Sequence, residues 1–266
     1  MPLLQKSFRI SFTLLLFCFG LNSTAQKPQN VLKWKQVWCD EFNYNGLPDS
    51  SKWTYDVGGE GYGNNELQYY TAKDTSNVKV KNGYLKITAH KQGVGKNPYT
   101  SARLLTKNKA VFKYGRIEVK AKIPAAVGTW PAIWMLGKNI DTAGWPACGE
   151  IDIMEHRASE LNKIFGTLHY PGHSGGNADG KTINIPTATT AFHIYSVEWD
   201  PSAIKIFVDN QLCHSVANHK SLPFNQDFFL ILNVAMGGNF AGNVDPLFTE
   251  DSMEVDYVRV YKLNNK

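Results

Sequence analysis

The chain has 266 residues, a formal net charge of +5 and 43% hydrophobic residues. A chain of this length can form one large all-β domain and bury a full core without disulfide staples. The weak positive charge, with no basic run and no stripe of Lys or Arg, gives no indication of a nucleic-acid partner.

Residues 1–25 have the pattern of a secretory signal peptide. Lys6 and Arg9 precede an apolar stretch over residues 10–21, and small residues lead up to Ala25. The stretch is too short to span a bilayer, and the small residues are typical of a cleavage site. We therefore expect cleavage after Ala25 and a secreted, periplasmic or cell-surface protein with no membrane span. An N-terminal membrane anchor is the alternative.

Short strands are expected along residues 26–266, which show no break in composition and form one domain in this interpretation. In chain order, alternating or apolar runs predict a hairpin over 77–89 that turns at Asn82-Gly83, then strands at 114–123, 192–199, 204–208, 228–234 and 255–261. None of these runs has a helical apolar period over three turns. The pattern predicts an all-β sandwich or jelly roll rather than a βαβ fold.

Three cysteines follow the signal segment: Cys39, Cys148 and Cys213. An odd count allows at most one disulfide, and the spacing is not that of a zinc site. In an exported chain Cys39 could pair with Cys213. Alternatively, all three are small buried apolar side chains.

Three tryptophans, Trp130, Trp134 and Trp145, precede a strongly acidic strand. Flat aromatic rings suit the apolar faces of sugars, whereas Asn, Gln and Arg suit sugar hydroxyls. Core packing is the alternative for any single Trp, since Trp is highly buried on average. Their concentration beside carboxylates favours a sugar-binding cleft.

The acidic strand is the hexapeptide EIDIME at residues 150–155. On a regular strand Glu150, Asp152 and Met154 share one face, and Glu155 lies on the other. One β-bulge between Asp152 and Glu155 would return Glu155 to the face of the other two acids. We expect that bulge, because like charges in an otherwise apolar strand are costly unless they serve chemistry.

Two carboxyl groups about 5 to 5.5 Å apart are what a retaining glycosidase requires. Glu150 and Glu155 are separated by roughly 13 Å of backbone, at about 3.3 Å per strand step, so their side chains must lean together. Asp152 between them could share a proton or orient the nucleophile. Its charge would also raise the pKa of a neighbouring carboxyl, as a general acid near neutral pH requires.

Over residues 37–262 the chain resembles glycoside hydrolase family 16, in its bacterial laminarinase-like branch. The motifs that carry the resemblance are WCDEF (38–42), GNNELQYY (63–70), GRIEVKA (115–121), GTWPAIW (128–134), GEIDIMEH (149–156), FLILNVAMGG (229–238) and MEVDYVRVY (253–261). The resemblance implies a concanavalin A-like jelly roll of two curved antiparallel sheets with a concave substrate cleft. It further implies an endo-acting retaining β-1,3-glucanase, with β-glucan as substrate and no cofactor for catalysis.

The same resemblance assigns roles to individual residues. It implies that Glu150 is the nucleophile, Glu155 the acid/base and Asp152 the supporting carboxylate. The other implied positions are the sugar ligands Asn64 and Arg103, the cleft walls Trp130 and Trp134, the acid/base neighbour His169, the cleft residue Asn233, and the structural Ca²⁺ ligands Glu41, Gly83 (through its carbonyl) and Asp256. Read without the family, His169 and Asn233 could be structural, and the two calcium acids could be ordinary exposed carboxylates.

Several alternatives stay open at this level. The same mechanism could act on mixed-linkage β-1,3-1,4-glucan or on a galactan of the agar or carrageenan type, or it could transfer to a sugar instead of water. A sulfated galactan should require more basic residues than Arg103 and Arg157 near the motifs. A non-catalytic carbohydrate-binding jelly roll has the same architecture, but such a module has no use for three closely spaced acids. We expect a monomer.

Overall fold

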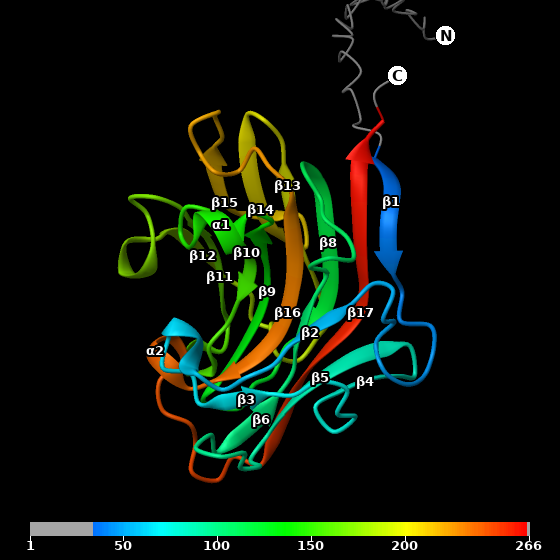
Figure 1. Cartoon of the computed structure of the whole chain (residues 1–266), viewed down its shortest axis with the longest axis vertical. Helices are drawn as coiled ribbons and strands as arrows, with labels where there is room; N and C mark the ends of the chain where they lie inside the picture. The colour runs from blue at the N-terminus through cyan, green and yellow to red at the C-terminus, as the bar shows by residue number, and fades with distance from the viewer. Residues whose placement is uncertain (1–33, 265–266) are drawn as a thin grey trace, which may run out of the picture. The chain divides into compact units, whose positions relative to one another are not determined.

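The computed structural model describes residues 34–264, so the predicted signal peptide lies outside the described residues. Two sheets contain nearly all of the regular structure (Figure 1). The ten-stranded sheet consists of β1 (Trp34–Asp40), β3 (Gln68–Tyr70), β4 (Val78–Lys81), β5 (Tyr84–His90), β6 (Tyr99–Ser101), β8 (Gly115–Lys122), β13 (His193–Trp199), β14 (Ala203–Val208), β15 (Gln211–Ala217) and β17 (Glu250–Leu263).

The seven-stranded sheet carries the acidic hexapeptide. Its strands, in spatial order, are β12 (Asp179–Asn184), β11 (Lys163–His169), β10 (Glu150–Glu155), β9 (Thr129–Gly137), β16 (Phe228–Met236), β7 (Arg103–Leu105) and β2 (Thr54–Asp56). Helices are limited to α1 (Ile140–Ala143), α2 (Gly238–Ala241) and three short 3₁₀ segments among the described residues. The all-β jelly-roll prediction is confirmed.

The hairpin predicted at Asn82-Gly83 joins β4 to β5. Lys81 pairs directly with Tyr84, so the turn has two residues. Asn82 and Gly83 both have positive φ, at 57° and 82°. This is the backbone that a tight hairpin turn requires and that Asn-Gly adopts readily. The other strands expected from the sequence correspond to β8, β13, β14, β16 and β17.

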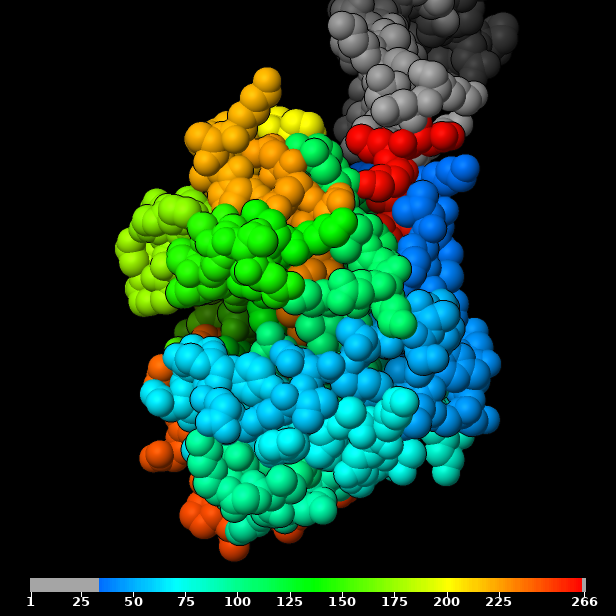
Figure 2. All heavy atoms as spheres, in the orientation of Figure 1, coloured from blue at the N-terminus to red at the C-terminus, as the bar shows by residue number. Residues whose placement is uncertain are grey.

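The main core lies between the two sheets. Strand β16 shows that the seven-stranded sheet buries apolar side chains on both of its faces. All nine of its residues are buried. Phe228, Leu230 and Leu232 belong to the main core. Phe229 and Ile231, on the opposite face, belong to a second and smaller apolar cluster. We call this opposite face of the seven-stranded sheet the cleft face, because Figure 2 shows the surface hollowed between the green segment around α1 and the cyan segment before β3.

The disulfide that the sequence allowed between Cys39 and Cys213 is not formed. All three cysteines in the described part are free thiols. Cys39 lies on β1 and Cys213 on β15, and four strands of the ten-stranded sheet separate them. No helix between residues 34 and 264 is long and apolar enough to cross a membrane.

Candidate active site

The predicted bulge is present in β10. The pairing with β9 skips a residue between Asp152 and Met154, and the pairing with β11 skips one between Asp152 and Glu155. The consecutive residues Ile153 and Met154 are both fully buried in the main core. Because two neighbours share the core face, Glu155 returns to the cleft face with Glu150 and Asp152. The bulge that the spacing of the acids in the hexapeptide predicted is therefore confirmed.

Glu150 begins β10 and is half-buried. The indole Nε1 of Trp145, in the loop after α1, donates a hydrogen bond of 2.7 Å to Glu150 Oε2. Burial, followed by the charge of nearby Asp152, raises the pKa of Glu150 to about 8. The Trp145 bond acts in the other direction, because a donor to a carboxylate stabilises its ionised form.

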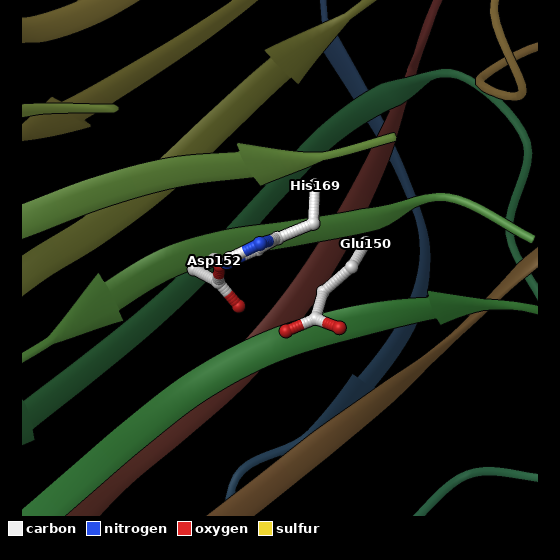
Figure 3. Close-up of side chains that lie close together, drawn as sticks. All are labelled: Glu150, Asp152 and His169. Carbon is white, nitrogen blue, oxygen red and sulfur yellow. Dashed lines mark ion pairs between the residues drawn. The ribbon is translucent and has the colours of Figure 1, made fainter. Parts of the chain in front are cut away.

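Asp152 is the most enclosed of the three acids, with 2% of its surface exposed. Figure 3 shows His169 of β11 and Glu150 converging on it, and its Oδ2 lies 3.2 Å from His169 Nε2. The backbone N–H of Gly175 donates to His169 Nδ1 at 3.3 Å. In the neutral ring Nε2 therefore carries the proton and faces Asp152. His169 thus contacts the middle carboxyl of the cluster.

Glu155 ends β10 and is also half-buried. The indole Nε1 of Trp130 donates to its Oε1 at 2.9 Å. On its other side the Trp130 ring packs against Phe240 of α2, with ring centroids 4.9 Å apart. Burial, and then the charge of Glu150, raises the pKa of Glu155 to about 7, against the lowering effect of the Trp130 bond.

The three carboxyl groups cannot all be ionised near neutral pH. Burial and the charge of Glu155 raise the pKa of Asp152 well above its usual range. Asp152 is the most buried member, so its charged form is the most costly, and it keeps a proton most readily. The cluster can then present one protonated acid and one carboxylate at the cleft face. General acid catalysis combined with nucleophilic attack needs such a pair.

Three of the residues expected to bind substrate lie together beside the acids. Trp134 Nε1 donates to Asn233 Oδ1 at 2.7 Å. Asn233 is paired in register with Arg103 across β16 and β7. The Arg103 guanidinium lies over the Trp134 ring, 4.7 Å from its centroid, and its Nε is 3.3 Å from an Asp56 carboxylate oxygen. Arg103, Trp134 and Asn233 therefore form one hydrogen-bonding and stacking surface.

Glu66, a carboxyl group that the sequence analysis missed, lies between Asn64 and this surface: the Tyr70 hydroxyl donates to Glu66 at 3.5 Å and accepts from Asn233 Nδ2 at 3.0 Å. Asn64 Nδ2 donates to Glu66 Oε1 at 3.2 Å, and Gln68 Nε2 donates to Glu66 Oε2 at 2.7 Å. Glu66 is 8% exposed, and burial raises its pKa. The signal that could have indicated it is the alternation of Glu66, Gln68 and Tyr70, which leads into β3. Such alternation directs the three side chains to one face, where Gln68 and Tyr70 both donate to Glu66.

The residues expected to hold calcium come from elements that meet at one edge of β17. This edge pairs with β5 up to Val255 and with β1 from Val258, so Asp256 lies at the change of partner. Carboxylate oxygens are suitable calcium ligands. In the structure, however, Arg259 holds Glu41 through two hydrogen bonds and keeps its pKa below the usual value. Asp256 pairs with Lys120 at 2.7 Å. Calcium binding there, with the Gly83 carbonyl, stays a prediction.

The chain and its fold are both similar to known proteins. Residues 65–259 match the sequence model of the family described as "Glycosyl hydrolases family 16". The chain is 43% identical to a beta-glucanase of Rhodothermus marinus, across 98% of each chain. It is 37% identical to a glucan endo-1,3-beta-glucosidase of Cryptopygus antarcticus, across 87% of this chain and 93% of that relative. The solved structure of the R. marinus laminarinase superposes with a TM-score of 0.84 at 45% identity, covering 88% of this chain and all of that one.

Proposed function

The chain belongs to family 16 of the glycosyl hydrolases, and we propose that Glu150 and Glu155 carry out its reaction as nucleophile and acid/base. The enzyme is an endo-β-1,3-glucanase of a family that retains the anomeric configuration and needs no cofactor for catalysis. The family resemblance seen in the sequence is thereby confirmed. The observation that carries the proposed roles is the bulge, which brings both glutamates to one face with an indole N–H on each.

In the first step Glu155 gives its proton to the glycosidic oxygen as the bond to the anomeric carbon breaks. The Glu150 carboxylate attacks that carbon from the opposite side and forms a glycosyl ester. In the second step Glu155, now ionised, takes a proton from water, and the water oxygen displaces Glu150. The leaving sugar keeps the first proton, and the second restores Glu155, so the cycle closes without an external acid.

Asp152 prepares Glu150 for attack. Glu150 must be ionised, although burial opposes its charge. A proton held on Asp152 can be shared with Glu150, and the Trp145 N–H already lies 2.7 Å from its Oε2. Both donors stabilise the ionised form of Glu150. His169 borders that carboxyl, with its Nε2 3.2 Å from Asp152 Oδ2.

The surface beside the acids is suited to a neutral glucan. The Trp134 indole offers a flat face, while Asn64, Asn233 and Arg103 offer hydrogen bonds to hydroxyls. The charge of Arg103 is already paired with the Asp56 carboxylate. This balance supports a β-1,3-glucan chain over a sulfated galactan, whose anionic groups would require uncompensated cations.

Glu150→Ala should abolish hydrolysis of laminarin, and azide should restore turnover with an inverted product, since azide replaces the missing carboxylate. Glu250→Gln, at a side chain of the other sheet that is 60% exposed, is the matched control and should keep full activity. Substantial turnover by Glu150→Ala without azide would refute the nucleophile assignment. Parallel incubation with lichenan, agarose and carrageenan, with measurement of reducing ends and product sizes, tests the linkage preference.

We propose two further features on the same basis. Residues 1–25 act as a signal peptide for export, as their charged, apolar and small-residue order supports. A calcium ion bound by Glu41, Asp256 and the Gly83 carbonyl stabilises the fold away from the cleft. Oxygen donors just after β1, in the turn between β4 and β5, and on β17 support it.

A further inference from the structure

Five lysines gather on the solvent side of the ten-stranded sheet, far apart in the sequence but on adjoining strands. We call the surface they form the outer lysine face: Lys79 and Lys81 of β4, Lys86 of β5, and Lys120 and Lys122 of β8. The residues that alternate with them, such as Val80, Leu85 and Val119, are buried in the main core. The lysines therefore point away from the core on the opposite face. β4, β5 and β17 run side by side at the lower right of Figure 1.

Positive charge is in excess on this face. Lys120 pairs with Asp256 at 2.7 Å and Lys122 with Glu254 at 2.8 Å. Lys79, Lys81 and Lys86 have no ion pair among the described residues. Lys79 also lies directly opposite Lys86 in the β4–β5 register, and like charges in that position are destabilising.

Protection of a sheet edge explains only part of this arrangement. β4 pairs with β5 on one side and with Gly46 through a single bridge at Val80 on the other, and lysines on such an edge strand discourage pairing with another chain. Lys86, however, lies on β5, which has strand partners on both sides, and it has no ion pair in the described part of the chain. Glu254 faces Lys86 in the β5–β17 register but pairs with Lys122 instead. The positive charge of Lys86 serves no edge, so a negatively charged ligand remains as a partner for it.

An aromatic pair and a hollow complete the face. Tyr84 and Phe192 stack with ring centroids 5.2 Å apart and planes 24° apart. The ammonium groups of Lys120 and Lys122 lie 5.8 and 5.6 Å from the Phe192 ring centroid. Tyr84 remains 37% exposed at the rim. A hollow of about 410 Å³ is lined by Lys79, Lys81, Asn82, Tyr84, Lys86 and Glu254.

We propose that the outer lysine face is a second glycan-binding site, which takes an acidic polysaccharide bearing carboxylate or sulfate groups. The uncompensated lysines meet the anionic groups, Tyr84 lies against a sugar ring, and Asn82 is available to a hydroxyl. A membrane surface would require apolar side chains to insert, and among residues 34–264 Tyr84 is the one exposed aromatic on this face. A nucleic acid strand would need several stacking rings in succession.

This site differs in kind from the catalytic cleft. The cleft is suited to a neutral glucan, whereas the outer face lies on the other sheet and is suited to a polyanion. An enzyme with both would be held on a mixed matrix through the acidic polymer while it cleaves the neutral one. The second contact would raise the local concentration of enzyme on the matrix without altering the chemistry.

The test measures binding of the full chain to dextran sulfate and to polygalacturonate by isothermal titration calorimetry, with neutral dextran as the blank. K79Q/K86Q should weaken both interactions about tenfold and reduce the slope of log Kd against log salt by about two, one per lysine. K205Q/K220Q makes the same change in net charge at exposed lysines elsewhere and should alter Kd less than about twofold.

Two further readouts keep the test specific. Hydrolysis of laminarin should keep its kcat and KM in K79Q/K86Q, and its thermal midpoint should not fall, because the substitution removes a like-charge pair. Titrations with EDTA and with calcium separate the effect of the ion expected at Asp256. The proposal fails if wild type binds neither polyanion, if both double variants lose binding equally, if laminarin oligosaccharides compete, or if anionic vesicles bind and the glycans do not.

Discussion

Glu155→Gln should make the protein more stable at pH 8 and leave its stability at pH 5 almost unchanged. In the folded chain the pKa of Glu155 is raised from 4.5 to about 7, mainly by burial and then by the charge of Glu150. Between these two values the folded state binds more protons than the unfolded state. The free energy of unfolding therefore falls as the pH rises through that window.

The size of the effect follows from the shift. The difference between 4.5 and about 7, at about 1.4 kcal/mol per pKa unit, gives at most about 3 kcal/mol. Part of it is shared with Glu150 and Asp152, which titrate with Glu155. Glutamine keeps an oxygen that can accept the Trp130 N–H. For a chain of this size about 1 kcal/mol moves the midpoint by roughly 2 to 4 °C, so we expect a gain of several degrees at pH 8.

Thermal unfolding followed by circular dichroism at pH 5 and pH 8 measures the difference. Glu60→Gln is the control, because its carboxyl is 87% exposed and pairs only with Lys96. Its midpoint should shift by less than about 1 °C at either pH, since exposed ion pairs contribute little. The reasoning is refuted if Glu155→Gln has the same effect at both pH values, or if it destabilises the protein at pH 8.

Three further predictions use the same site and the calcium residues. In wild type, the pH profile of kcat/KM on laminarin should be bell-shaped, because Glu155 must keep its proton and Glu150 must lose its own, and burial raises their pKa values to about 7 and about 8; a flat profile from pH 6 to 9 would contradict these roles. Trp130→Phe and Phe240→Ala should move the optimum of this profile to higher pH, because the indole bond that lowers the Glu155 pKa is lost or misplaced. Trp134→Phe should weaken substrate binding without moving the pH profile. Calcium added to chelated protein should raise the melting temperature, and Asp256→Asn should remove that rise; an unchanged midpoint in wild type would count against the site.

Local sequence signals predicted most of the fold. Asn82-Gly83 predicted a two-residue turn, because few other pairs adopt two consecutive positive φ angles. Those local signals do not predict which residues far apart in the sequence come into contact. The contact of Phe240 with Trp130 joins residues on α2 and β9, and nothing in either segment indicates it. The possible Cys39–Cys213 bridge failed for the same reason, since strand order, not spacing, decides which cysteines meet.

The bulge in β10 connects the stability of the fold with its chemistry. Ile153 and Met154 are both enclosed in the main core, so the core would lose a well-packed side chain if either were turned outward. That packing maintains the extra residue, and the extra residue maintains Glu155 on the cleft face. Regular alternation would instead place the Glu155 carboxyl among apolar side chains, where an unpaired charge is most costly. The same hydrophobic burial that stabilises the two sheets therefore compels three acids to share one face, at a cost that appears as their raised pKa values.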